Sequence, residues 1–285
     1  MGKTVYVLGE LNADLIMTGE DVTPEWNREK LVDSFETALG SSSAITACGL
    51  AGLGLRVRFV SVAGDDQLGA FCMERLREQG VDTAHVAVKP GVRTGVTLSL
   101  ATGKDRALLT YMGSIPLLAP EDVPDELFEP ADHIHFGSYY LQDGMRDAWL
   151  DLFRKAKEKG ITTSFDMGWD PRGLWHREKV LALLPFTDLF MPSEDELSAM
   201  LGCAGVEEAL AALPPMNGVA AVKRGARGAV MLTPGGERLD APAFRVQPID
   251  PTGAGDSFNA GLIFATLSGY GRAEALRFAC ACGAL

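Results

Sequence analysis

The chain has 285 residues, of which 47% are hydrophobic and 22% charged, the composition of an ordinary globular protein. Its 38 acidic and 26 basic residues give a net charge of −12, which argues against nucleic-acid binding because that function needs a basic face. No apolar run is long enough to cross a bilayer and no signal peptide is visible, so we expect no membrane partner. The five cysteines have neither metal-ligand nor redox spacing and fit the reduced thiols of a cytoplasmic protein.

The first part of the chain alternates between strand-like and helix-like segments. Residues 4–8 are β-rich and apolar and predict a buried strand. Residues 41–53 are small and apolar, with serines available as an N-cap, and predict a tightly packed helix. Residues 56–62 predict a strand, and 68–79 predict a helix that is closed by Gly80.

The same alternation resumes in the second half of the chain. The predicted strands are 133–136, 161–165, 189–191 and 219–222, and the predicted helices are 145–159, 193–201 and 255–267. Strands that alternate with helices in this way form a parallel sheet with helices on both faces. We therefore predict an α/β fold.

Two stretches interrupt the alternation. Residues 15–35 are polar and lack helical periodicity, whereas 94–101 and 106–112 are β-rich runs joined by a hairpin signal. We predict that these stretches meet as one small β-sheet lid that is discontinuous in the sequence. In this division the lid comprises 15–35 and 94–113, and the α/β core comprises 1–14, 36–93 and 114–285.

The most informative segment, DPTGAGDSFNAG, spans residues 250–261. Gly253, Ala254 and Gly255 allow a ligand to approach the backbone with little obstruction from side chains. The apolar residues that follow predict a helix. Because the first N–H groups of a helix are unpaired and lie at the positive end of its dipole, this segment predicts an anion-binding site.

Asp256 is unexpected at such a site if the site only binds phosphate. It makes chemical sense as a base that accepts the proton of a hydroxyl attacking a phosphoryl group, while the neighbouring N–H groups neutralise the transferring charge. The alternative is a Gly-rich helix cap in which Asp256 is merely favourable in the first turn. Both interpretations fit the segment when it is taken alone.

The pattern Asp250-x-Thr252-Gly-Ala-Gly-Asp256 resembles the C-terminal signature of the ribokinase-like (PfkB) carbohydrate kinases. Further segments resemble that family's motifs and occur in its order: Gly9–Asp14, Leu39–Ala47, Gly64–Gly69, Gly80–Asp82, Pro192–Glu196 and Lys223–Gly228. The resemblance implies a doubly wound, mostly parallel sheet flanked by helices, with a small β lid. It also implies ATP, Mg²⁺ and often an activating monovalent cation such as K⁺.

The resemblance further implies a role for individual residues. The catalytic group comprises Asp256 with Gly253, Ala254 and Gly255, and the acceptor-binding group comprises Asn12, Asp14, Gly40, Ser41 and Arg93. The nucleotide-binding group comprises Lys223, Gly225, Gly228 and Ser193. The metal-binding group comprises Glu196, which would hold Mg²⁺ through water, and Asp250 with Thr252, which would serve a monovalent cation.

Structural alternatives exist for two of these groups. Asn12 and Asp14 follow a predicted strand end, where α/β folds bind ligands, but the same residues suit an Asx turn. Ser193 and Glu196 also have the spacing of a capping box at a helix start. A capping role and a ligand-binding role can hold together.

The sequence departs from the family pattern at several positions. Ile45 replaces the usual Asn of the Gly-rich substrate segment, Ser41 replaces its second Gly, and Ser193 replaces the Asn of the phosphate motif. Ile45 cannot donate a hydrogen bond to a sugar hydroxyl. Met112 follows Tyr111, where kinases of keto-deoxy sugar acids carry an Arg nearby, so an acidic sugar is less favoured.

We therefore predict an ATP-dependent sugar kinase that acts on a small sugar. A nucleoside kinase of the same fold is the alternative among enzymes, and a non-catalytic sugar-binding regulator is the alternative of another class. A nicotinamide dehydrogenase is disfavoured because Gly52 and Gly54 lack the third glycine of the dinucleotide fingerprint. The resemblance also makes a homodimer through the exposed face of the lid plausible.

Overall fold

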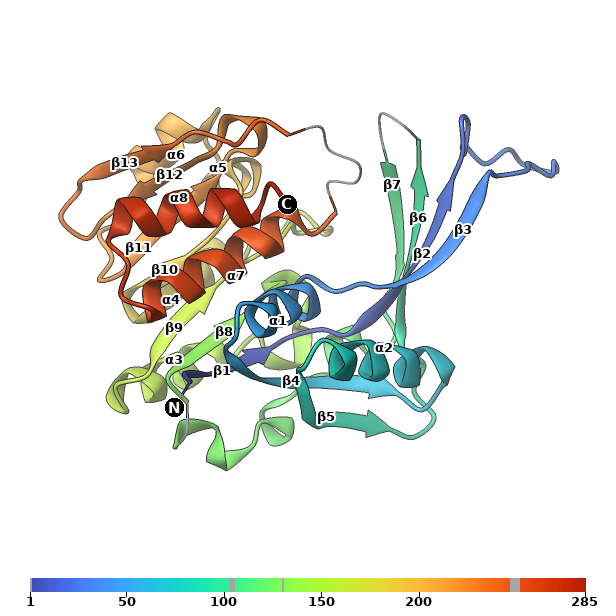
Figure 1. The fold of residues 1–285 in the computed structure, drawn as a ribbon, viewed down its shortest axis with the longest axis horizontal. Helices are drawn as coiled ribbons and strands as arrows, with labels where there is room; N and C mark the ends of the chain where they lie inside the picture. The colour runs from blue at the N-terminus through green and yellow to red at the C-terminus, as the bar shows by residue number, and fades with distance from the viewer. Residues whose placement is uncertain (1, 103–105, 130, 247–251) are drawn as a thin grey trace.

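A computed structural model describes residues 2–102, 106–129, 131–246 and 252–285. Two sheets organise this part of the chain, a nine-stranded sheet among the helices and a four-stranded sheet that extends away from it at the right of Figure 1. The active-site motifs named above lie on the segments that connect or flank these sheets, so the arrangement of the strands decides which motifs meet.

The nine-stranded sheet has the order β13-β12-β11-β10-β9-β8-β1-β4-β5. All its neighbours pair in parallel except β11–β12 and β12–β13. The direction in which strands are added reverses at β1, and crevices at such switch points bind ligands in α/β folds. The bounds are β1 Thr4–Leu8, β4 Arg56–Gly64, β5 Asp82–Lys89, β8 His133–Phe136, β9 Thr162–Phe165, β10 Leu189–Phe190, β11 Val219–Lys223, β12 Ala229–Leu232 and β13 Arg238–Ala241.

Two apolar clusters cover the two faces of this sheet. Along β1, Val5 and Val7 pack toward one cluster while Tyr6 and Leu8 pack toward the other, because successive side chains of a strand point to opposite faces. One cluster receives α1 Ser42–Gly52, α2 Gln67–Glu78, α7 Ala254–Leu267 and α8 Arg272–Cys282; the other receives α3 Trp149–Glu158, α4 Arg177–Leu183, α5 Glu194–Leu201 and α6 Val206–Ala212. This confirms the predicted sheet with helices on both faces.

The four-stranded sheet has the order β3-β2-β6-β7. Its strands come from two separate segments: β2 Asn12–Thr18 and β3 Ser34–Leu39 from the first, and β6 Gly95–Ala101 and β7 Arg106–Tyr111 from the second. The segment boundaries at 15 and 35 fall inside β2 and β3. Asn and Asp often mark turns, but here Asn12 and Asp14 are held extended by pairing with Gly95 and Thr97.

Most predicted elements agree with the structure, and one helix start was wrong. Helix α3 begins at Trp149 and not at residue 145, because Asp143–Met145 forms a separate 3-10 turn. All five cysteines are free. No helix within the described residues is both long and apolar enough to span a membrane.

Candidate active site

The glycine-rich segment begins helix α7 as predicted. Gly253 is the N-cap residue and has a φ of 78°, a left-handed conformation that favours glycine. A Cβ on Gly253 would also lie 3.2 Å from Cγ2 of Ile45 in α1. Ala254, Gly255 and Asp256 form the first turn of α7, so the positive end of the helix dipole lies beside the carboxyl of Asp256.

Asp256 is half-buried between α7 and the start of α1. Its Oδ1 accepts a hydrogen bond from Oγ of Ser42, and its carbonyl oxygen lies 3.5 Å from Oγ1 of Thr46. Burial raises the pKa of Asp256 to about 7; the Ser42 hydrogen bond opposes this shift and the charge of Asp166 adds to it. A carboxyl with this pKa can exchange protons near neutral pH, as a general base must.

A buried ion pair lies beside the same helix start. Nζ of Lys223, at the end of β11, is 2.5 Å from Oδ2 of Asp166 and 3.4 Å from Oδ1 of Asn259, while Nδ2 of Asn259 donates to Asp166 at 2.6 Å. Burial alone would lower the pKa of Lys223, but the charges of Asp166 and Glu196 outweigh it and raise that pKa. The ammonium group therefore stays charged. It lies 3.7 Å from the position that a Cβ on Gly255 would occupy.

Ser193 and Glu196 form the capping box of α5. The N–H of Ser193 donates to Oε2 of Glu196 at 2.7 Å, and Oγ of Ser193 accepts from the N–H of Glu196 at 3.2 Å. Burial and the charge of Asp166 raise the pKa of Glu196. The structural interpretation of this motif is therefore confirmed, and the carboxylate it holds lies in an environment that a cation would stabilise.

Asn12 and Asp14 begin the small sheet beside the core. Nδ2 of Asn12 donates to Oδ1 of Asp14 at 3.0 Å and to Oγ1 of Thr97 at 3.4 Å. A Cβ on Gly40 would lie 2.1 Å from Oδ1 of Asp14 and 2.5 Å from Nδ2 of Asn12. Only glycine allows the backbone at position 40 to come this close to both side chains.

Glu10 has no role among the sequence predictions, and its carboxylate is only 3% exposed. Oγ of Ser41 donates to the Glu10 carbonyl at 2.6 Å, and the Glu10 carboxylate accepts from Ser43, Ser138 and Gln142 at 2.8, 3.0 and 3.3 Å. These bonds hold Ser41 at a φ of 73°, where a non-glycine residue is strained. The acidic residue directly after Gly9, within the segment Gly9–Asp14, was the sequence signal that could have found it.

Three other predicted residues, Arg93, Gly225 and Gly228, lie on separate segments. Arg93 is exposed and lies near Asp66, whose pKa its charge helps to lower against burial. Gly225 and Gly228 have φ values of 53° and 88°. A Cβ on Gly228 would lie 2.0 Å from the carbonyl oxygen of Ala241, so the β11–β12 turn by itself requires glycine there.

The two residues predicted to serve a monovalent cation are Asp250 and Thr252. Asp250 lies outside the described residues. Oγ1 of Thr252 accepts a hydrogen bond from Nη1 of Arg106 in β7. This bond joins the small sheet to the segment that enters α7, so it spans the space between the two sheets.

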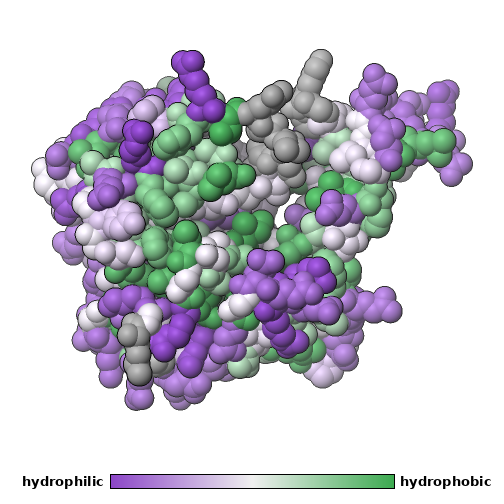
Figure 2. All heavy atoms as spheres, in the orientation of Figure 1, coloured by the Kyte–Doolittle hydropathy of each residue, from purple (hydrophilic) through white to green (hydrophobic). Residues whose placement is uncertain are grey.

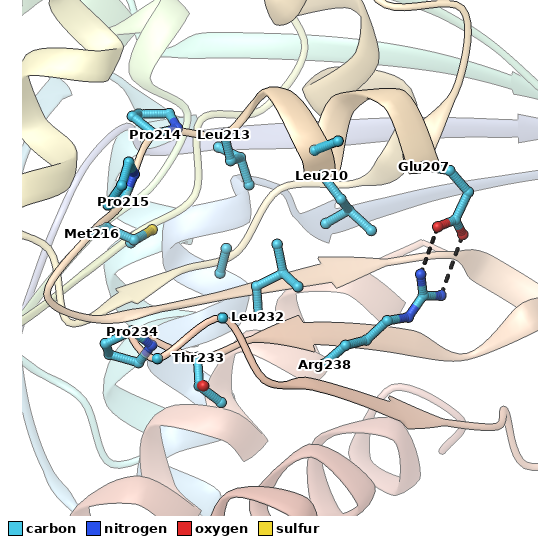
Figure 3. A pocket seen from close by; sticks show the side chains of 14 residues that line it. Glu207, Leu210, Leu213, Pro214, Pro215, Met216, Leu232, Thr233, Pro234 and Arg238 are labelled. Carbon is cyan, nitrogen blue, oxygen red and sulfur yellow. Dashed lines mark hydrogen bonds and ion pairs between the residues drawn. The ribbon is translucent and has the colours of Figure 1, made fainter.

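One hollow of the surface lies away from the predicted site residues. On the face drawn in Figure 2, hydrophobic residues gather toward the middle and hydrophilic residues dominate the periphery. Figure 3 shows this hollow, which lies between α6 and the β12–β13 hairpin and is lined mainly by apolar side chains, with the Glu207–Arg238 ion pair at one end. None of the predicted site residues lines that hollow.

The sequence resembles known sugar and nucleoside kinases along nearly its whole length. The family model described as pfkB family carbohydrate kinase matches residues 3–285. The ATP-dependent ribose-1-phosphate kinase of Halopiger xanaduensis is 32% identical, covering 99% of this chain and 90% of that protein. The aminoimidazole riboside kinase of Salmonella typhimurium is 28% identical, covering 99% and 88%.

A solved structure of a putative ribokinase II from E. coli in complex with ATP and Mg²⁺ has a TM-score of 0.84. It is 25% identical, and the match covers 100% of this chain and 92% of that chain. The match to the family model covers almost the whole chain, and the two sheets share the arrangement of that fold. The chain therefore belongs to the pfkB family of carbohydrate kinases, ATP-dependent enzymes that phosphorylate a hydroxyl group of a small sugar.

Proposed function

We propose that Asp256 is the general base that accepts the proton of the sugar hydroxyl while the γ-phosphoryl group of ATP is transferred to it. The observation that carries the proposal is a carboxyl with a pKa of about 7 in the first turn of α7. As the new O–P bond forms, the bond to the β-phosphate oxygen breaks and ADP leaves. The N–H groups of Gly253, Ala254 and Gly255 would stabilise the charge on the transferring group.

Asn12 and Asp14 would hold the acceptor between the small sheet and α7. An amide and a carboxylate together can donate to and accept from neighbouring hydroxyls. Gly40 and Ser41 would shape this subsite through the close approach described above. Arg93 would act at its edge, since it is exposed at the base of the small sheet. Closure of that sheet would exclude water, which otherwise competes for the phosphoryl group.

The nucleotide would lie on the β11 side of α7, against Lys223, Gly225, Gly228 and Ser193. The charged Lys223 beside Gly255 suits a bound phosphate. Half-buried Glu196, whose pKa is raised, suits Mg²⁺ held through water, because Mg²⁺ commonly keeps waters and shares its remaining positions with phosphate oxygens. Mg²⁺ would neutralise phosphate charge during transfer.

Two finer features extend this proposal. Asp250 and Thr252 would serve an activating monovalent cation such as K⁺. The small sheet would also form a homodimer contact, because one of its faces exposes the apolar side chains Phe35, Leu109 and Tyr111, and exposed apolar patches mark interaction sites. Activity with K⁺ against an equal concentration of a larger organic cation tests the first feature, and sedimentation of the pure protein tests the second.

The experiment that tests the base combines an acceptor panel with one substitution. ATP consumption is measured with sugars, sugar phosphates, sugar acids and nucleosides, because a nucleoside kinase of this fold is the alternative. With the best acceptor, Asp256→Asn should lower kcat by about 10²–10⁴-fold. The exposed Asp125, changed to Asn, is the control and should retain parental kcat. An Asp256→Asn variant within about tenfold of the parental kcat contradicts the assignment.

A further inference from the structure

Two buried histidines lie beneath the site and take no part in the reaction described so far. His133 and His135 alternate along β8 and are 1% and 0% exposed. Both point to the face of the central sheet that carries α1 and α7, since the intervening Ile134 belongs to the opposite apolar cluster. Polar groups this deeply buried need hydrogen-bond partners.

The two histidines belong to one continuous series of hydrogen bonds across β8 and β9. Oγ1 of Thr162 donates to the carbonyl oxygen of Asp132 at 2.9 Å and lies 2.8 Å from Nδ1 of His133. Oγ of Ser164 lies 2.7 Å from Nε2 of His133 and 2.8 Å from Nδ1 of His135. Burial lowers the pKa of His133 to about 3 and that of His135 to about 4, so both rings are neutral at pH 7.

This series of hydrogen bonds determines which ring nitrogen of each histidine carries a proton. The Thr162 hydroxyl uses its single proton in the hydrogen bond to the Asp132 carbonyl, so Nδ1–H of His133 must donate to Thr162. Nε2 of His133 is then an acceptor, and the Ser164 hydroxyl donates a hydrogen bond to it. Ser164 in turn must accept from Nδ1–H of His135. Nε2 of His135 is therefore left as a bare acceptor.

That nitrogen has no hydrogen-bond partner among the described residues. It lies 3.8 Å from the point where Gly137 would carry a Cβ, and Oγ of Ser42 lies 3.8 Å from the same point, with Oγ of Ser43 at 3.0 Å. Because Gly137 carries no Cβ, Nε2 of His135 and Oγ of Ser42 flank the side of its backbone from which a side chain would project. A buried water typically makes about three hydrogen bonds to polar groups, and the His135 nitrogen and the two serine hydroxyls are such groups.

We propose that His135 is a positioning residue that gives Ser42 a second hydrogen-bond acceptor, through one water beside Gly137, and so stabilises Asp256 in its protonated state. This inference rests on the proposed role of Asp256. While Asp256 is ionised, Ser42 donates to it. Once Asp256 has taken the acceptor's proton, it donates to Oγ of Ser42, and the Ser42 hydroxyl turns to the water that His135 accepts from. No proton moves onto His135.

Four charged groups influence the titration of His133, His135 or Asp256 and must be held constant in a test. They are Glu10 after β1, Asp166 after β9, Lys223 at the end of β11 and, near His133, Lys157 of α3. None of these groups is changed in the variants below. The direction of these hydrogen bonds can be measured in the unmodified protein, because long-range ¹H–¹⁵N spectra identify which ring nitrogen of each histidine carries the proton. We expect Nδ1–H for both rings at pH 7, and an Nε2–H tautomer of His135 overturns the proposal.

The kinetic test compares two substitutions that differ in the atoms they keep. His135→Asn can keep the bond to Ser164 but loses the Nε2 acceptor, whereas the amide oxygen of His135→Gln reaches the Nε2 position. Without the acceptor the protonated state of Asp256 is less stable, so its pKa falls. We expect His135→Asn to move the acidic limb of the kcat/KM profile down by about half to one pH unit and to lower kcat about two- to tenfold, with KM unchanged. His135→Gln should restore much of both.

Two further variants separate positioning from a structural effect. Gly137→Ala places a methyl group 3.8 Å from both Nε2 of His135 and Oγ of Ser42, where it would exclude the proposed water, and should reproduce the shift of His135→Asn. In a Ser42→Ala background, His135→Asn should cause no further shift, because the coupling runs through Ser42. His85, a partly buried histidine on β5, changed to Asn is the control and should leave the profile unchanged.

The outcomes are distinguishable. If Asp256→Asn is inactive while His135→Asn leaves both kcat and the acidic limb unchanged, the base stands and the positioning role is wrong. An additive effect of His135→Asn in the Ser42→Ala background also overturns it. If Asp256→Asn remains active, the proposed base is wrong and the positioning role falls with it.

Discussion

At the scale of single residues, the site holds charges in places that cost folding free energy. Asp256 is half-buried with its pKa raised to about 7, and Asp166 and Lys223 form a buried ion pair. Moving charges out of water costs several kcal/mol unless partners compensate. Asp166 has compensating partners in Lys223 and Asn259, while the Ser42 hydrogen bond compensates Asp256 only in part.

This difference predicts how stability depends on pH. The folded protein keeps a proton on Asp256 up to about pH 7, whereas an unfolded aspartate loses it near pH 4. The stabilisation from that proton is complete below about pH 4 and is lost as pH rises through about 7. Asp256→Asn, which carries no charge, should therefore be more stable than the parent by about 1–3 kcal/mol at pH 8.

Urea unfolding at pH 8, 6 and 4 measures this difference, which should shrink as the pH falls. The exposed Asp125→Asn variant serves as the matched control and should show no such trend. Equal stability of Asp256→Asn and parent at pH 8 would mean that the folded protein solvates Asp256 well, and the pKa of about 7 would then be wrong.

At the scale of elements, the start of α7 shows two glycines with different requirements. Gly253 is needed for the turn, since its φ is 78°. Gly255 has ordinary helical surroundings, and a Cβ there would meet only the Lys223 side chain at 3.7 Å, a normal contact. Folding therefore gives no reason for glycine at 255, and close approach of a ligand is the remaining reason.

Gly255→Ala should consequently keep its stability and lose activity. The free energy of unfolding should stay equal or rise by up to about 1 kcal/mol, because alanine favours a helix over glycine. kcat/KM for ATP should fall about tenfold or more as the methyl group keeps phosphate from the N–H groups. Gly52→Ala, in α1 and free of contacts, controls for the helix effect and should remain fully active.

At the scale of the whole molecule, chain crossings and side-chain hydrogen bonds join the two sheets. Chain crossings such as Leu8 to Asn12 link them covalently, and the Arg106–Thr252 hydrogen bond spans the space between them. At the base, Asp66 accepts from the N–H of Thr94 at 3.0 Å and from its hydroxyl at 2.7 Å. We propose that a sheet tethered in this way closes over ligands as a unit.

Hydrogen exchange tests that motion. With the best acceptor and a non-hydrolysable ATP analogue present, amides of β2 and β7 should exchange about tenfold more slowly, whereas those of β1 and β8 in the core should change little. Either ligand alone should give a smaller effect, because closure needs contacts from both. Identical exchange of β2 and β7 with and without ligands would contradict a lid function.

The sequence by itself determined the architecture and the chemistry at the start of α7. Apolar runs such as 4–8 and 133–136 coincide with β1 and β8, because buried strands show in hydrophobic pattern alone. The Gly253–Asp256 segment likewise predicted a helix start with an acid in its first turn. These features are local, so neighbouring residues carry all the information that they need.

Tertiary structure alone decided which distant groups meet. The extension of β2 back to Asn12 depends on pairing with β6, some eighty residues away, and no local pattern encodes that. The burial of Glu10, the Lys223–Asp166 pair and the proton order from Asp132 to His135 likewise depend on strands adjacent only in the folded sheet. Desolvation, which raises the pKa of Asp256, is a property of packing, and it exists only once α1 and α7 have closed around the carboxyl.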